Sequence, residues 1–211
     1  KKNEVKIIVF DGSRVTYPFK GSFIDLKLPA WDGFFFKTVQ LIRRSFQLST
    51  LFRRENPDHI FSFMESANFP SIFAAYFSGK LKQLKVSVHA DPVNFSKFQR
   101  LLISYLYCYP KQVVSVSKGV SYALIKMGVP FKKIKIIYNP LPSSISTVSK
   151  PLIRPINAPE KYILGVGRLD KNKGFDLLIE AFLNISDINM HLVILGEGEE
   201  RKNLESLIAK K

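Results

Sequence analysis

The stretch GVGRLDKNKGFDLLIEAF, residues 165–182, decides the fold prediction for the end of the chain. Residues 163–166 form a short apolar run that ends among glycines, which predicts a strand followed by a tight turn. Four apolar side chains then recur at the spacing of one helix face: Phe175, Leu178, Ile179 and Phe182. The stretch therefore predicts a strand, a turn and a helix.

Two cations, Arg168 and Lys173, lie where this turn meets the helix. The free N–H groups and the positive dipole end of a helix favour an anion there, and a guanidinium binds phosphate oxygens through its planar fork. A dinucleotide fingerprint is excluded because no third glycine follows at the required offset, and a Walker loop is excluded because Gly-Lys-Ser/Thr is absent. A diphosphate clamp of Gly167, Arg168 and Lys173 remains, with an ordinary surface turn as the alternative.

The chain of 211 residues is long for one domain and short for two. A Pro- and Ser-rich stretch at 141–159 predicts a linker between a first domain at 1–140 and a second at 160–211. After residue 160, only a strand–helix–strand–helix stretch remains, with its second strand at 192–195 and its second helix from Glu200. Because so short a stretch cannot bury both faces of its strands, we expect the second domain to be cut short.

Strands and helices alternate through the first domain, which predicts an α/β fold with a parallel sheet covered on both faces. Strands are expected at 5–10, 22–28, 58–63, 85–88, 112–116 and 135–138, all but the second in one sheet. Helices are expected at 33–54, 67–77 with Pro70 in its first turn, 97–108, and 118–127 with Ser117 as its cap.

The net charge of +15 lies entirely in residues 1–150, which hold 23 Lys and Arg against 8 Asp and Glu. This bias suits an anionic partner such as membrane headgroups, a phosphorylated lipid or nucleic acid, or it is merely a soluble basic surface. No apolar run approaches the ~20 residues that span a bilayer. The single cysteine, Cys108, cannot form an intrachain disulfide, which favours a reducing, cytoplasmic setting.

The predicted helix at 33–54 carries one apolar stripe and several cations. Phe35, Val39, Ile42 and Phe46 form the stripe, with Phe34, Leu41, Leu48 and Phe52 beside it and Lys37, Arg43, Arg44 and Arg54 largely opposite. One interpretation is a helix that packs the stripe on the core and keeps a solvated basic face. The other is that this face, together with Lys97, Arg100 and Lys111, meets anionic headgroups or a lipid diphosphate.

Several motifs, in the same order, resemble a known family. Gly-Val-Gly-Arg-Leu at 165–169 with Lys-Gly at 173–174, Leu-Gly-Glu-Gly at 195–198, Ser-Val-Ser-Lys at 115–118 and Tyr-Asn-Pro at 138–140 resemble the retaining glycosyltransferases of family four. The resemblance runs from about Val5 to the end of the chain. It implies two Rossmann-like domains of the GT-B type, the first without its N-terminal strand and the second truncated after about two strand–helix units.

The resemblance also implies roles for single residues. Gly167, Arg168 and Lys173 would bind the donor diphosphate, and His89 would lie near the donor sugar and the acceptor hydroxyl as a catalytic residue. Glu65, with Ser66, would face the same crevice on the acceptor side. From the residues alone, His89 is equally a structural histidine and Glu65 a loop carboxylate. No Asp-x-Asp pair occurs in the sequence, so no metal and no other cofactor is expected.

The expected function is the transfer, with retention, of a hexosyl or N-acetylhexosaminyl group from a nucleotide diphosphate donor, UDP-linked, to a glycan or a polyprenyl-diphosphate saccharide. We expect it in the cytoplasm, at the inner face of the cell membrane. The family's first strand and its pair of glutamates eight residues apart are missing, so we expect this chain alone to be inactive. The alternatives are a non-catalytic nucleotide-sugar-binding fragment and a basic nucleic-acid-binding module.

Overall fold

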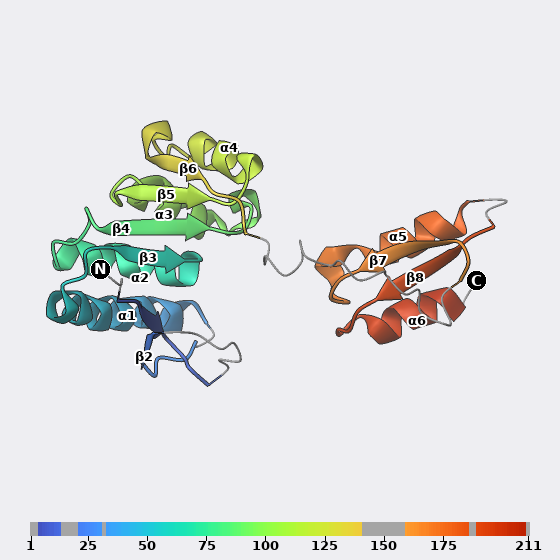
Figure 1. The fold of residues 1–211 in the computed structure, drawn as a ribbon, viewed down its shortest axis with the longest axis horizontal. Coiled ribbons are helices and arrows are strands. Elements are labelled where there is room, and N and C mark those ends of the chain that lie inside the picture. Colours follow the sequence, from blue (N-terminus) through green and yellow to red (C-terminus); the bar gives the residue numbers. More distant parts are fainter. Residues whose placement is uncertain (1–3, 14–20, 31–32, 141–158, 186–188, 210–211) are drawn as a thin grey trace. The chain divides into compact units, whose positions relative to one another are not determined.

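A computed structural model describes residues 4–13, 21–30, 33–140, 159–185 and 189–209. The chain forms two compact units, Lys1–Leu141 and Pro142–Lys211 (Figure 1). Of the predicted linker at 141–159, only Pro159 lies among the described residues.

The first unit contains a sheet of four parallel strands that follow one another in chain order. They are β3 (Ile60–Phe63), β4 (Leu84–Val88), β5 (Gln112–Ser115) and β6 (Ile134–Ile136). Each was predicted from its apolar run, with ends that differ by at most two residues. The α/β class and the parallel pairing are confirmed.

The first predicted strand does not join this sheet. β1 (Lys6–Val9) pairs in parallel with β2 (Ser22–Asp25) in a separate ladder, so the prediction of one sheet holding all five strands is wrong. An apolar run shows that a strand is buried, but it does not specify which strand lies beside it.

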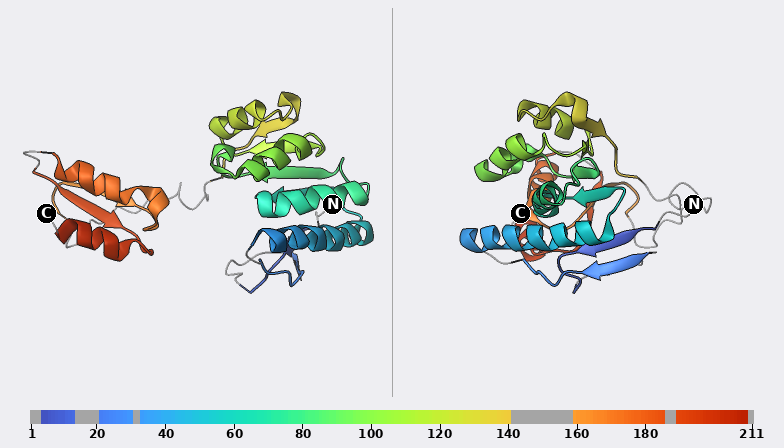
Figure 2. Two further views of the ribbon diagram at one scale, coloured as in Figure 1. Left: turned by 180° about the vertical axis from the view of Figure 1, so that it is seen from behind. Right: turned by 90° about the vertical axis from the view of Figure 1, so that its left-hand side faces the viewer.

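The helices of this unit lie on one side of the β3–β6 sheet, as both views in Figure 2 show. They are α1 (Phe34–Glu55), α2 (Glu65–Phe77), α3 (Lys97–Leu106) and α4 (Lys118–Lys126). Strands that follow in chain order through right-handed crossovers place every connecting helix on the same side. On the other side Phe61 and Phe63 of β3 are exposed, so the expected cover of both faces is not present among the described residues.

The core of this unit lies between the sheet and its helices. Leu84, Val86, Ile103, Tyr107 and Val113 are completely buried there. Two predicted helix starts are confirmed by their caps. Ser117 Oγ accepts a hydrogen bond from the Val120 N–H at 3.2 Å, and Ser96 forms a reciprocal capping box with Gln99 at the start of α3.

Helix α2 begins earlier than its sequence suggests. Met64 has φ 68°, and the helix starts at the next residue, Glu65. Pro70 is therefore the sixth helical residue and not part of the first turn, which corrects the prediction. Its position removes the hydrogen bond that an N–H at 70 would give to the carbonyl of Ser66.

Helix α1 buries a different face from the predicted one. Leu48 and Phe52 are buried, whereas Ile42 and Phe46 are 64% and 74% exposed. The interpretation that packed the stripe of Ile42 and Phe46 on the core is therefore wrong. Two apolar stripes overlap on this helix, and helical periodicity cannot tell which of them meets a neighbour.

Polar side chains of α1 face inward because backbone carbonyls meet them there. Arg44 Nη2 donates to the Leu28 carbonyl oxygen at 2.9 Å, and its guanidinium lies 4.3 Å from the centroid of the Phe10 ring. Gln40 donates to the Pro29 carbonyl. Burial lowers the pKa of Arg44. Arg44 thus belongs to the packed face, not to the solvated basic face.

The second unit consists of two strand–helix pairs. Strands β7 (Tyr162–Val166) and β8 (His191–Leu195) are parallel, and helices α5 (Phe175–Leu183) and α6 (Arg201–Ala209) follow them. Its small core is formed by Leu169, Phe175, Ile179 and Leu204. On the strands, four side chains remain exposed: Tyr162, Leu164, Val166 and Leu195. The prediction that this unit leaves one face of its strands uncovered is confirmed for the described residues. No described helix is long and apolar enough to cross a membrane.

Candidate functional site

The turn after β7 is held in place by the loop after β8. The Gly167 N–H donates to the Leu195 carbonyl at 3.0 Å, and the Leu169 N–H donates to the Glu197 carbonyl at 2.9 Å. The Glu200 N–H donates back to the Leu169 carbonyl at 2.9 Å. Residues 167–169 therefore have a fixed backbone without help from any side chain.

Two glycines make this close approach possible. A Cβ atom at Gly196 would overlap the carbonyl oxygen of Gly167, and one at Gly198 would overlap that of Leu169. Only glycine leaves room for backbone against backbone here. The sequence motif at 195–198 contributed to the family resemblance, but its contact with the turn was not predicted, because nothing in local spacing shows which loops meet.

Arg168 presents its guanidinium to solvent beside a carboxylate. Its Nη2 lies 2.5 Å from Asp170 Oδ2, while 81% of the Arg168 side chain and only 13% of the Asp170 side chain is exposed. Asp170 was not among the predicted site residues. Its Oδ1 is buried without a hydrogen-bond partner in the described structure. Asp170 therefore pairs with one terminal nitrogen of an arginine whose side chain is otherwise mostly exposed.

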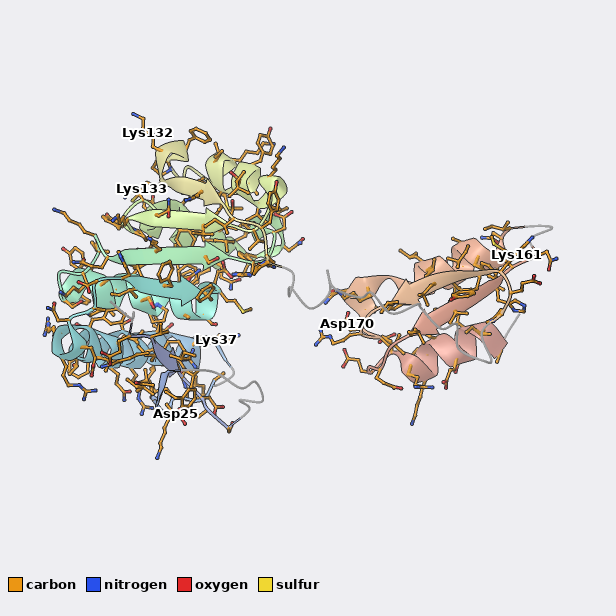
Figure 3. All side chains as sticks on the ribbon, viewed as in Figure 1. Asp25, Lys37, Lys132, Lys133, Lys161 and Asp170 are labelled. Atoms are coloured by element: carbon orange, nitrogen blue, oxygen red, sulfur yellow. The ribbon has the colours of Figure 1, made fainter. Side chains whose placement is uncertain are left out.

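Lys173 lies at the same turn. It ends a short 3-10 helix, η4 (Lys171–Lys173), and its Cδ lies 3.9 Å from where a Cβ of Gly167 would be. Since Arg168 is the next residue after Gly167, both cations belong to this one turn. Figure 3 shows Asp170 at this end of the unit and Lys161 at the opposite end.

Helix α5 begins at this turn without a side-chain cap. Gly174, at φ 66°, occupies the cap position, and no side chain accepts from the first N–H groups of the helix. These N–H groups, the helix dipole and the two cations together suit a diphosphate. The first turn also carries an exposed carboxylate, Asp176, which lowers the positive potential there.

In the first unit, His89 directly follows β4 and is exposed. Its Nε2 lies 3.0 Å from Ser87 Oγ, and its ring centroid is 5.8 Å from that of Phe63. Carboxyl ends of parallel strands are where folds of this type bind ligands. The placement agrees with the predicted one, and the chemical role of His89 stays a prediction.

Glu65 lies near the end of the neighbouring strand but is buried. Phe63 of β3 is in register with Ser87 of β4, so Glu65 and His89 each follow a paired position by two residues. Glu65 is the first residue of α2 and only 8% exposed, which corrects its interpretation as a loop carboxylate. Burial raises the pKa of its carboxyl, and its Oε1 has no hydrogen-bond partner in the described structure.

Buried, hydrogen-bonded side chains lie next to the end of β4, the strand that His89 follows. Asn68 Nδ2 donates to the Ser87 carbonyl at 3.0 Å and to the Tyr107 hydroxyl at 3.1 Å, and both Asn68 and Tyr107 are completely buried. Burial, and then the charge of Glu65, raise the pKa of Tyr107. These hydrogen bonds hold the end of β4, which His89 follows. The described residues contain no group of three or more His, Cys, Asp or Glu side chains placed to hold a metal ion.

Comparison with known families assigns both units. Residues 1–144 match the family described as Glycosyltransferase Family 4, and residues 150–211 match the family described as Glycosyl transferases group 1. The chain belongs to glycosyltransferase family 4. Both expectations drawn from the motifs, the family and the two-Rossmann-domain GT-B fold, are confirmed.

One curated relative matches most of the chain. It is the N-acetylgalactosamine-N,N'-diacetylbacillosaminyl-diphospho-undecaprenol 4-alpha-N-acetylgalactosaminyltransferase of Campylobacter jejuni, 29% identical over 179 residues, which are 82% of this chain and 48% of that protein. An uncharacterized glycosyltransferase of Methanocaldococcus jannaschii is 35% identical over 116 residues, 50% of this chain and 30% of that protein. The chain thus spans at most about half the length of these relatives.

Solved structures share the fold. The apo form of the lipopolysaccharide outer core galactosyltransferase WaaB superposes with a TM-score of 0.64 at 15% identity, over 90% of this chain and 50% of that one. Anabaena HepE in complex with UDP-glucose superposes with a TM-score of 0.60 at 21% identity, over 79% of this chain and 48% of that one. At these identities the likeness establishes the architecture only.

Proposed function

We propose that this family 4 chain binds the diphosphate of a nucleotide-sugar donor at Gly167, Arg168 and Lys173 and serves a retaining transfer of the sugar to a glycan acceptor. The observation that carries the proposal is that two cations, Arg168 beside Gly167 in the chain and Lys173 beside it in space, lie at the uncapped start of α5. A single cation on a surface turn would bind phosphate weakly. Two cations and a helix N-terminus at one fixed turn form a diphosphate site.

The chemistry explains why cations are needed at this place. Breaking a glycosyl phosphate bond puts negative charge on the leaving diphosphate while the sugar becomes oxocarbenium-like. Arg168 and Lys173 stabilise that charge more in the transition state than in the ground state. In this proposal they take the part that a metal ion takes elsewhere, and no metal or other cofactor is required.

His89 is the proposed catalytic residue of the first unit, next to the transferred sugar and the acceptor hydroxyl. It is exposed at the carboxyl end of β4, and Ser87 fixes one of its ring nitrogens. Glu65 is proposed to act on the acceptor side. Because Glu65 is buried, it would not contact an acceptor directly. It would act by packing against the strand ends that position His89 and by its charge there.

The finer assignments rest on the relatives. The Campylobacter jejuni protein acts, by its name, on a diphospho-undecaprenol-linked saccharide with N-acetylgalactosamine, and the HepE structure holds UDP-glucose. They support a UDP-linked hexose or N-acetylhexosamine as donor and a polyprenyl-diphosphate saccharide as acceptor. An enzyme for such an acceptor works at the cytoplasmic face of the membrane. The positive charge of residues 1–150 would be attracted to the anionic lipids there.

A transfer assay tests the proposal. The full-length protein is incubated with a radiolabelled UDP-sugar and a polyprenyl-diphosphate saccharide, and the anomeric configuration of the product is read by NMR. We expect transfer with retention, a loss of roughly 100-fold or more in Arg168→Ala and Lys173→Ala, and near-parent activity in Lys161→Ala, at the far end of the same unit. UDP binding by a folded parent protein without transfer would favour the non-catalytic alternative, and inversion would refute the retaining mechanism.

A further inference from the structure

The ring of His89 has a single hydrogen-bond partner among the described residues, the hydroxyl of Ser87. Ser87 Oγ lies 3.0 Å from His89 Nε2, which leaves the other ring nitrogen, Nδ1, for a ligand. Ser87 belongs to β4 and His89 follows it by two positions, so both side chains lie on one face of the sheet. This is the face without helices (Figure 2), because Phe63 is in register with Ser87 and is 57% exposed.

The backbone that carries the Ser87 hydroxyl is fixed. Strand β4 is paired on both sides, with β3 and with β5. The Ser87 carbonyl accepts hydrogen bonds from the Met64 N–H at 3.1 Å and from Asn68 Nδ2 at 3.0 Å. The Phe63 ring lies against the ring of His89, with centroids 5.8 Å apart. The imidazole is therefore held between a hydroxyl and an aromatic ring.

The direction of the hydrogen bond follows from the donors and acceptors that surround Ser87. A serine hydroxyl has one O–H to donate. Ser87 is only 6% exposed, and in the described part of the chain its Oγ has no hydrogen-bond partner besides His89 Nε2. If Nε2 carried the proton, the covered O–H would lack an acceptor, which costs free energy. The hydroxyl therefore donates to Nε2, and the neutral ring carries its proton on Nδ1.

We infer that Ser87 is a positioning residue that keeps the neutral ring of His89 protonated on Nδ1, so that His89 offers substrate a hydrogen-bond donor and not a base. The Nδ1–H group donates to a hydroxyl oxygen of the sugar or the acceptor. A ring protonated on Nε2 would present a lone pair there instead. The inference rests on the proposed function for the presence of substrate beside His89, whereas the state of the ring is a property of this chain alone.

Nuclear magnetic resonance reads the state of the ring with no substrate present. Long-range 1H–15N spectra of the 15N-labelled 211-residue chain distinguish the two ring nitrogens at alkaline pH, where imidazole is neutral. The chain has only three histidines, so His89→Gln assigns the signals. We expect the Nδ1-protonated form to predominate in the parent, and Ser87→Ala to shift the ring toward the Nε2-protonated form that histidine favours in water. A parent ring protonated mainly on Nε2, or no change in Ser87→Ala, would overturn the inference.

Ser62→Ala is the matched control. Ser62, on the neighbouring strand β3, is 5% exposed, and its Oγ has no hydrogen-bond partner among the described residues. Because it alternates with Phe63, its side chain lies on the opposite face of the sheet from His89. The ring should keep its Nδ1 proton in Ser62→Ala, and also in Ser87→Thr, which retains a hydroxyl and suits a strand. An equal shift in Ser62→Ala would mean that the ring responds to packing and not to the Ser87 hydroxyl, and would refute the inference.

Transfer kinetics of the full-length protein connect the ring to the reaction. We expect Ser87→Ala to lower kcat roughly tenfold or more, with the donor KM changed by less than about twofold, and Ser87→Thr to recover most of the activity. In a His89→Ala background, Ser87→Ala should have no further effect, because a positioning residue acts only through the ring. Equal losses in both backgrounds would overturn the inference. A parent without transfer would count against the proposed function, while the spectra would still decide the state of the ring.

Discussion

Arg168 and Asp170 form an ion pair with Nη2 and Oδ2 2.5 Å apart at the turn that also carries Lys173. Because Asp170 is mostly covered and Arg168 is mostly exposed, removing Arg168 leaves a covered carboxylate with neither oxygen paired. We predict that Arg168→Ala lowers both sugar transfer and the stability of the second unit, the latter by about 1 kcal/mol or less because the pair meets solvent. Lys173→Ala should lower transfer alone. Paired transfer assays and thermal melts separate the two effects, and a stable Arg168→Ala with full activity would refute the clamp.

The glycines after β8 give a second prediction. A side chain at Gly196 or Gly198 would meet the backbone of Gly167 or Leu169, which has no flexible end to move away. We expect Gly196→Ala and Gly198→Ala each to destabilise the second unit by about 1–3 kcal/mol or more in denaturant unfolding. Gly119, in helix α4, is the control, since its added Cβ meets only an ordinary contact at 3.8 Å and Ala favours a helix. A Gly196→Ala chain as stable as the parent would contradict the packing described for this turn.

The buried carboxyl of Glu65 should make the stability of the first unit depend on pH. Its pKa in the folded chain is raised by burial above the unfolded value of about 4.3. Between those two values the folded chain keeps a proton that the unfolded chain has lost, so the free energy of unfolding falls as pH rises through this window. A glutamine at this position cannot ionise, so the free energy of unfolding of Glu65→Gln should not decrease in this way. The stability of Glu65→Gln relative to the parent should therefore increase from pH 4 to pH 7.

Melting temperatures of the parent and Glu65→Gln at several pH values measure this difference. Asp58→Asn, which removes one exposed carboxylate from the same unit, controls for the change in net charge. Parallel curves for the parent and Glu65→Gln would show that Glu65 keeps an ordinary environment in solution.

Asn68 should be the most costly polar side chain to remove from the first unit. It donates to the Ser87 carbonyl and to the Tyr107 hydroxyl inside the core. We predict that Asn68→Ala costs about 2–4 kcal/mol, because a cavity is left and both partners lose a buried hydrogen bond. Asn94→Ala, at an exposed position of the same unit, should cost about 0.5 kcal/mol or less in the same unfolding experiment. A small effect at Asn68 would mean that water replaces its side chain.

Local patterns in the sequence predicted much of the fold. Apolar runs located the strands of the β3–β6 sheet, Ser117 located the start of α4, and the spacing of Phe175 and Ile179 located α5. These features depend on residues close together in the chain, so a single sequence contains them.

Features that depend on distant segments were not predicted. The separate pairing of β1 with β2, the inward Arg44 and the contact of Gly196 with Gly167 all arise between parts of the chain that local spacing does not relate. The same holds for the site. The cations at 168 and 173 could be found from one turn, whereas the covered Asp170 and the burial of Glu65 depend on how surrounding backbone packs.

The most direct test of the central claim is a nuclear magnetic resonance titration of the 15N-labelled chain with UDP, which detects weak binding. The account predicts that amide signals of Gly167, Arg168 and the first turn of α5 shift together as UDP is added, and that Arg168→Ala or Lys173→Ala abolishes these shifts while Lys161→Ala preserves them. UDP shifts that leave this turn untouched, or that persist unchanged in Arg168→Ala, would contradict the diphosphate site.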